Sequence, residues 1–189
     1  IHDHGARRVI ADGTAFRFGE HVFTFGEDVR ELTDSAALRD DPGALRERLA
    51  EDGYLFIRGF HPREDAERAA EFTLGAIAER GGLAPETPIA EGRVGPDNRN
   101  FPFFRVLEVA HDRRILDVVD SEATFDFYAS LFDKPALTFD KRWLRCMATG
   151  GHNHFHYDNV YVGRGTPNRL TMWTALTDTD LDEGPLVIC

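Results

Sequence analysis

The chain has 189 residues, of which 42% are hydrophobic and 29% are charged, and this composition is typical of a globular protein rather than a disordered one. Its 22 basic and 33 acidic residues give a net charge of -11, which argues against non-specific binding to nucleic acid or to an anionic membrane surface. Two cysteines, Cys146 and Cys189, form no disulfide framework, so a reducing, cytoplasmic setting is the simplest expectation. No apolar run approaches the roughly 20 residues that a membrane span needs.

Short strands are predicted for the N-terminal region, residues 1–35. Asp12-Gly13 is a hairpin-type turn signal, and phenylalanines such as Phe16 and Phe18 follow it at alternating positions. Such dense phenylalanine favours the packing edge of a sheet or the wall of a pocket.

Helices are predicted next. Asp41 followed by Pro42 indicates a helix start, because an acidic N-cap precedes proline at the first helical position, and Gly53 indicates its end. Residues 54–57 are expected to form a short buried strand, and apolar residues at helical spacing predict a second helix over 63–80.

A long loop rich in proline and glycine is predicted over residues 83–103. Loops of this length often serve as lids or binding segments, although a plain surface loop fits equally well. Arg99 and Arg105 are the residues there best suited to meet an anionic substrate. Helices then return, with Asp120-Ser121 as a cap between two of them.

From Ala136 the apolar period changes to two, which indicates strands. Further strands are predicted over 158–162, 170–176 and from 185 onward. Helices followed by closely spaced strands indicate an α+β fold with a barrel-like or sandwich sheet. We expect one domain over 1–189, with N-terminal strands (1–35), a helical flank and lid loop (36–135) and the sheet (136–189).

The chemistry is concentrated in a short histidine-rich run that contains His152, His154, His156 and Asp158. In a strand, residues two apart face the same way, so His156 and Asp158 could bind one metal ion. Imidazole and carboxylate together suit Fe(II), Mn(II) and Zn(II). With one more histidine, this pair would complete the facial triad of non-haem Fe(II) oxygenases. His152 and His154 lie nearer Gly150-Gly151, where the conformational freedom of glycine breaks the two-residue alternation of side chains, so we interpret them as loop or supporting residues.

Two segments resemble the phytanoyl-CoA dioxygenase family of Fe(II)/2-oxoglutarate oxygenases. The first is residues 49–60 (LAEDGYLFIRGF). The second runs from 156–158 (HYD) through 170–176 (LTMWTAL) to 183–188 (EGPLVI). The resemblance covers about residues 36–189 and implies a double-stranded β-helix (jelly-roll) core with flanking N-terminal helices.

This resemblance also implies functional residues. His156 and Asp158 would be two of three Fe(II) ligands, and Trp173, with Thr171 less surely, would line the 2-oxoglutarate pocket. In the family, a distal histidine ligand and an arginine that clamps 2-oxoglutarate follow the Gly-Pro-Leu segment, so both are expected beyond Cys189, and the jelly roll is expected to be incomplete at the C-terminus.

The implied activity is hydroxylation of a small organic substrate with O2, coupled to decarboxylation of 2-oxoglutarate to succinate. One alternative is a non-catalytic or degenerate jelly-roll binding module. Another is a Zn or Mn cupin-like enzyme that uses His152, His154 and His156. The identity of the substrate cannot be deduced from the sequence. Arg164 and Arg169 lie where the site entrance is expected, but a solvated face is the simpler interpretation for both.

Overall fold

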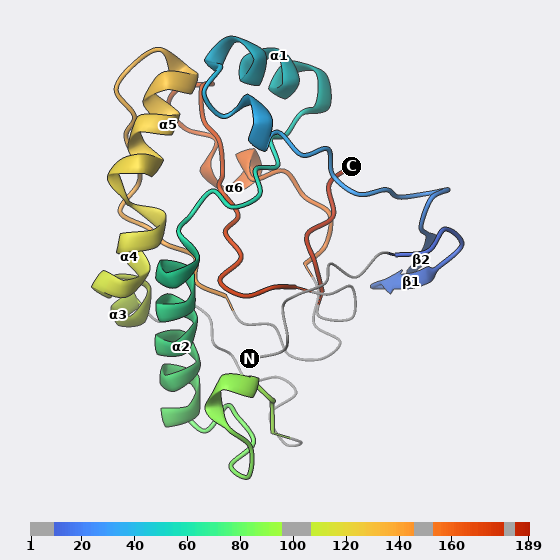
Figure 1. Cartoon of the computed structure of the whole chain (residues 1–189), viewed down its shortest axis with the longest axis vertical. Coiled ribbons are helices and arrows are strands. Elements are labelled where there is room, and N and C mark those ends of the chain that lie inside the picture. Colours follow the sequence, from blue (N-terminus) through green and yellow to red (C-terminus); the bar gives the residue numbers. More distant parts are fainter. Residues whose placement is uncertain (1–9, 96–106, 146–152, 180–183) are drawn as a thin grey trace. The chain divides into compact units, whose positions relative to one another are not determined.

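Figure 1 shows the computed structural model of the chain. The chain divides into two compact units. The described residues are 10–95, 107–145, 153–179 and 184–189. The first unit contains the described residues within 1–30, 73–104 and 145–189, and the second contains those within 31–72 and 105–144.

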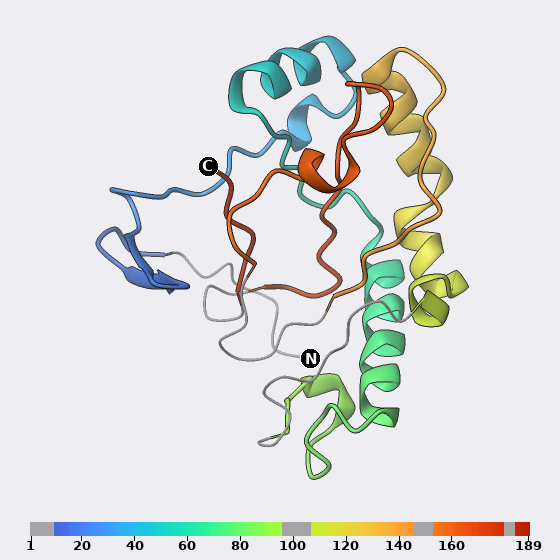
Figure 2. The same cartoon turned by 180° about the vertical axis from the view of Figure 1, so that it is seen from behind.

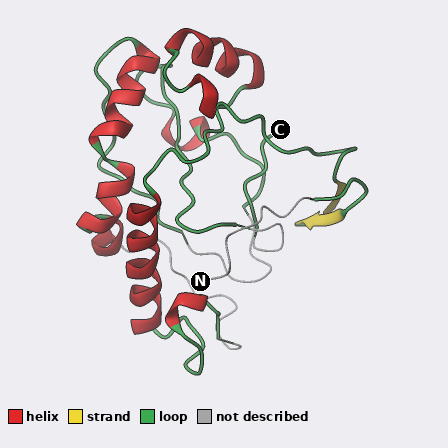
Figure 3. Ribbon diagram, in the orientation of Figure 1, coloured by secondary structure: helices red, strands yellow, loops and turns green. Residues whose placement is uncertain are grey.

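Helices dominate the regular structure of the described residues, as Figure 3 shows. The helices are α1 (Pro42–Asp52), α2 (Arg63–Glu79), α3 (Leu107–Ala110), α4 (Arg113–Val119), α5 (Glu122–Phe132) and α6 (Asn159–Val162), with 3₁₀ turns η1 (Ala36–Leu38) and η2 (Ile89–Glu91). The strands β1 (Ala15–Phe18) and β2 (His21–Thr24) pair antiparallel. No helix within the described ranges is both long and apolar enough to cross a membrane.

The predicted helix boundaries after residue 40 are confirmed. Asp41 caps α1 by accepting a hydrogen bond from the Ala44 amide at 3.0 Å, and Gly53 ends the helix in the left-handed region with φ of 77°. Ser121 caps α5 in the same way, through the Thr124 amide at 3.3 Å. These caps satisfy amide groups that have no partner inside the helix.

The core of the second unit forms where α1 and α5 lie side by side in both views (Figure 1 and Figure 2). Leu45 of α1 and Leu131 of α5 are buried, and Arg46 donates to the Ser130 carbonyl at 3.1 Å. Phe60 packs edge-on against Phe127 with ring centroids 5.1 Å apart. Apolar burial therefore holds these two helices together, and one arginine satisfies a carbonyl at the end of α5.

Two predictions about strands need correction. Residues 159–162 form α6, a helical turn, and not a strand. Residues 54–57 contain only an isolated bridge between Phe56 and Asp34, because a single residue pair lies opposite them. The hairpin turns at Gly19 and Glu20 between β1 and β2, although Asp12-Gly13 also forms a turn.

The jelly roll remains a prediction. Among the described residues the only sheet is that of β1 and β2, and residues 170–176 form no ladder. Their exposure nevertheless alternates, because Met172, Thr174 and Leu176 are less exposed than their neighbours. A period of two is what a strand with one covered face shows.

Candidate metal centre

The carboxylate of Asp158 lies beside the ring of His156, and α6 begins directly after it. The amides of Tyr161 and Val162 both donate to the Asp158 carbonyl, at 2.9 and 3.1 Å, so the chain coils directly after this residue. Asp158 Oδ1 then lies 3.3 Å from His156 Nε2. The two predicted ligands therefore meet, although a helical turn rather than a strand follows them.

The other ring nitrogen of His156, Nδ1, already makes a hydrogen bond within the chain. Nδ1 lies 2.6 Å from the carbonyl oxygen of His154. A carbonyl only accepts, so Nδ1 carries a proton and donates to it. Nε2, which faces the Asp158 carboxylate, is therefore the nitrogen through which His156 would bind a metal ion.

The spacing of these two atoms suits a shared metal ion. Two ligand atoms about 2.1 Å from one metal, at roughly a right angle, lie about 3 Å apart. The separation of His156 Nε2 and Asp158 Oδ1 is close to this at 3.3 Å. Both side chains are about two-thirds covered, with 33% and 31% of their surface exposed. The residues present fit a divalent metal ion in donor type and in spacing.

A chemically similar pair in the second unit shows which feature distinguishes a candidate metal site from a surface contact. His111 Nε2 lies 3.2 Å from Asp140 Oδ1, and His111 Nδ1 lies 2.9 Å from the Leu107 carbonyl. The Asp140 side chain, however, is 99% exposed. A fully solvated carboxylate on a loop adds little to a contact, so half-burial of both partners distinguishes the His156 pair.

Tyr161 is a contact of His156 that the sequence did not reveal. Its ring meets the imidazole edge-on, with centroids 5.6 Å apart and planes at 73°. In a strand, Tyr161 would face away from His156, and only the coil of α6 brings it back. The same turn is held from outside by Arg169, which hydrogen-bonds to Asn159 and also donates to the Arg164 carbonyl at 3.1 Å.

The residues predicted to line the 2-oxoglutarate pocket make no contact with this pair that the described part of the chain shows. Trp173 and Thr171 are both exposed, and no ring contact or hydrogen bond within the described ranges joins them to His156 or Asp158. The described residues contain no cluster of three metal-ligating side chains, so the third ligand stays a prediction. His154 is exposed and contributes its carbonyl. Three further residues of interest, His152, Arg99 and Arg105, lie outside the described residues.

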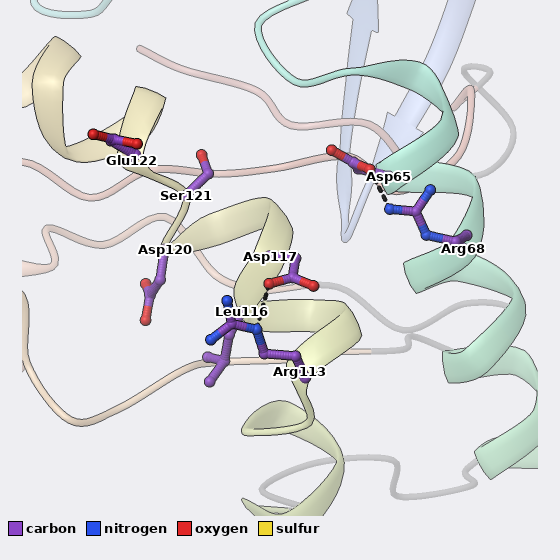
Figure 4. Close-up of a pocket in the computed structure, with 8 residues that line it drawn as sticks. All are labelled: Asp65, Arg68, Arg113, Leu116, Asp117, Asp120, Ser121 and Glu122. Carbon is purple, nitrogen blue, oxygen red and sulfur yellow. Dashed lines mark hydrogen bonds and ion pairs between the residues drawn. The ribbon is translucent and has the colours of Figure 1, made fainter.

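A hollow of about 500 Å³ in the second unit has a different character (Figure 4). It is lined by Asp65 and Arg68 of α2, by Arg113, Leu116 and Asp117 of α4, and by Asp120, Ser121 and Glu122 where α4 meets α5. Its arginines are paired, Arg68 with Asp65 and Arg113 with Asp117, as the dashed lines show. Small-molecule sites are mostly apolar, and this lining has one apolar side chain, so it is not the candidate site.

Comparison with known proteins gives one distant relative. The chain is 26% identical over 170 residues to 1-deoxypentalenic acid 11-beta-hydroxylase of Streptomyces arenae. The match covers 84% of this chain and 56% of the relative, so the chain spans a little over half of that protein's length. No family model matches the chain, and no solved structure matches it at a significant level. The similarity favours an oxidoreductase of the hydroxylase type and identifies neither its metal nor its co-substrate.

Proposed function

We propose that the chain belongs to a hydroxylase that depends on Fe(II) and 2-oxoglutarate, with His156 and Asp158 as two of the Fe(II) ligands. The observation that carries the proposal is the half-buried pair of Nε2 and Oδ1 at 3.3 Å, with Nδ1 of the same imidazole fixed on a carbonyl. The similarity to a hydroxylase supports the reaction type.

In this proposal the protein's task is to orient the ligands and to limit water. The His154 carbonyl fixes which nitrogen of His156 is available, and Tyr161 covers one side of the ring. Asp158 supplies a carboxylate oxygen as the second donor. Bound Fe(II) with 2-oxoglutarate would supply the activation of O2 for hydroxylation of a small organic substrate. Trp173 and Thr171 are proposed to line the 2-oxoglutarate pocket.

The test is the substitution Asp158→Ala in the full-length protein. Anaerobic titration with Fe(II) and 2-oxoglutarate should give a weak visible charge-transfer band in the wild type and none in the variant. We expect Fe(II) affinity to fall by about 100-fold or more, because loss of a direct ligand exceeds the 10- to 100-fold cost of losing an outer partner. Production of succinate should fall with it.

Asp140→Ala is the matched control. It removes the carboxylate from the His111 pair, whose 3.2 Å separation is nearly the same, and it should leave Fe(II) affinity unchanged. Unchanged succinate production in Asp158→Ala would refute the ligand assignment. Metal retained in Asp158→Ala but lost in His154→Ala would instead support a cupin-like site built from histidines. A wild type that gives no charge-transfer band would support a non-catalytic binding module.

A further inference from the structure

The hairpin of β1 and β2 presents an aromatic face. Phe16 lies opposite Phe23 in the register, and Phe18 lies opposite His21. Side chains alternate along a strand, so these four residues share one face of the hairpin. Val22 lies on the other face and is 58% exposed. A two-stranded hairpin is barely stable by itself, so this aromatic face needs a partner.

That partner is Phe155, which directly precedes the candidate ligand His156. The Phe155 ring stacks on Phe18 with centroids 5.0 Å apart and planes at 28°. It also meets Phe23 edge-on, with centroids 6.5 Å apart and planes at 84°. Two strands that lie about 130 residues earlier in the chain therefore hold this ring from two directions.

Phe155 is the residue between the two partners of the contact that orients the His156 ring. Phe155 lies between the carbonyl of His154 and the imidazole of His156, which are joined by the 2.6 Å contact of Nδ1. A rotation of the backbone at Phe155 would move one end of this contact against the other. If Nδ1 lost the carbonyl, the imidazole could turn, and Nε2 would no longer face Asp158.

We infer that Phe18 and Phe23 are positioning residues that orient the His156 imidazole for metal binding by stacking on Phe155. The inference rests on the proposed function, since it concerns the same Fe(II) site, and it adds a role for the N-terminal hairpin. These rings contact no metal ligand directly. They act by keeping the histidine in its binding orientation before the metal arrives, so their loss weakens Fe(II) binding.

The experiment is anaerobic titration of the intact protein with Fe(II) alone, comparing Phe18→Ala and Phe155→Ala with the wild type. We expect Fe(II) binding about fivefold weaker in each, which corresponds to about 1 kcal/mol and lies within the range of one aromatic pair. Phe18→Tyr and Phe155→Tyr keep the ring and should bind Fe(II) as the wild type does.

Val22→Ala is the control, because Val22 belongs to the same hairpin but lies on its other face and is 58% exposed. It should leave Fe(II) affinity unchanged. The thermal midpoint of each metal-free variant separates weaker metal binding from general unfolding. If Phe18→Ala does not fold, Phe18→Leu keeps an apolar side chain without the ring and serves for the same comparison.

The outcomes separate this inference from the proposed function. Wild-type Fe(II) affinity in Phe18→Ala and Phe155→Ala, with Asp158→Ala still deficient, would overturn the role of the hairpin and leave the site intact. A wild-type protein that binds no Fe(II), or binds it equally well without Asp158, would overturn both. Weaker binding in Phe18→Ala and Phe155→Ala alone, restored by tyrosine, would support the inference.

Discussion

Gly163→Ala tests whether the turn of α6 orients His156. Gly163 has φ of -68°, which alanine adopts freely, so backbone conformation does not demand glycine here. The obstacle is steric, because a Cβ at this position would lie 2.3 Å from the carbonyl oxygen of Asn159. Side-chain carbons essentially never approach within 3.0 Å of another atom, so the backbone must move by at least 0.7 Å.

A displacement of this size is enough to open α6. The last hydrogen bond of the turn joins the Val162 amide to the Asp158 carbonyl at 3.1 Å, and a displacement of 0.7 Å taken up entirely along it would stretch it to 3.8 Å, too long for a hydrogen bond. Tyr161 would then leave the His156 ring, which is a loss of about 1 kcal/mol, or about fivefold in Fe(II) affinity. The turn is a surface element, so the free energy of unfolding should change by less than about 1 kcal/mol.

The assay is anaerobic Fe(II) titration of the intact protein together with chemical denaturation. Gly75→Ala is the control, because a Cβ at Gly75 in α2 meets nothing within 4 Å. It should leave Fe(II) affinity unchanged and raise stability by about 0.5–1 kcal/mol through helix propensity. Wild-type Fe(II) affinity in Gly163→Ala would refute the view that α6 orients the imidazole. A similar fivefold loss in Tyr161→Ala, absent in Tyr161→Phe, would assign the effect to the ring.

Three further predictions concern stability. Burial raises the pKa of Tyr128 to about 12 from an ordinary value near 10. The contribution of this neutral tyrosine to the free energy of unfolding is therefore fully present below about pH 10, and it falls by roughly 2–3 kcal/mol as the pH rises to 12. Denaturation at several pH values should show this loss in the wild type and not in Tyr128→Phe. Ser35→Ala should raise the free energy of unfolding by about 1 kcal/mol, because the buried hydroxyl has no hydrogen-bond partner among the described residues; a lower denaturation midpoint would contradict this. Arg142→Ala should lower the free energy of unfolding by about 2 kcal/mol, because the carboxylate of Asp120, whose side chain is 23% exposed, loses the guanidinium that lies 3.0 Å away. Thermal unfolding should show this loss, and Asp120→Asn should lower the stability less.

The helical part of the fold was predictable because its signals are local. Asp41 and Pro42 start α1 and Gly53 ends it through contacts within a few residues, so the sequence contains the whole reason for the boundary. Strands differ, because a ladder needs a partner from elsewhere in the chain. Residues 170–176 show the alternating exposure of a strand, yet they have no paired neighbour within the described part of the chain. The two-residue period of these positions predicted which side chains share a face, but it could not predict with which strand they pair.

The candidate ligands were predictable in type but their neighbours were not. His156 and Asp158 are recognisable because imidazole and carboxylate two residues apart suit a metal. Tyr161 and Phe155 are apolar side chains whose importance depends on a helical turn and on a distant hairpin. The sequence did contain a signal for the turn, because Asp158 and Gly163 are residues typical of the start and the end of a helix. The β-branched Val160 and Val162 between them favoured the strand that was predicted instead.

The position of Asp158 explains why this turn matters for the chemistry. Aspartate before the first turn of a helix normally uses its carboxylate to cap a free amide. At α6 Asp158 makes no such bond, because its backbone is in the right-handed helical region (φ -57°, ψ -27°) and not in the extended region that a capping residue adopts, and its side chain lies 3.3 Å from His156. The helix start thus gives up a side-chain cap worth about 1 kcal/mol. Departures from local rules of this kind occur where function competes with stability. The carboxylate of Asp158 therefore does not cap its own helix and lies beside the imidazole of His156, which is the placement that the proposed metal ligand needs.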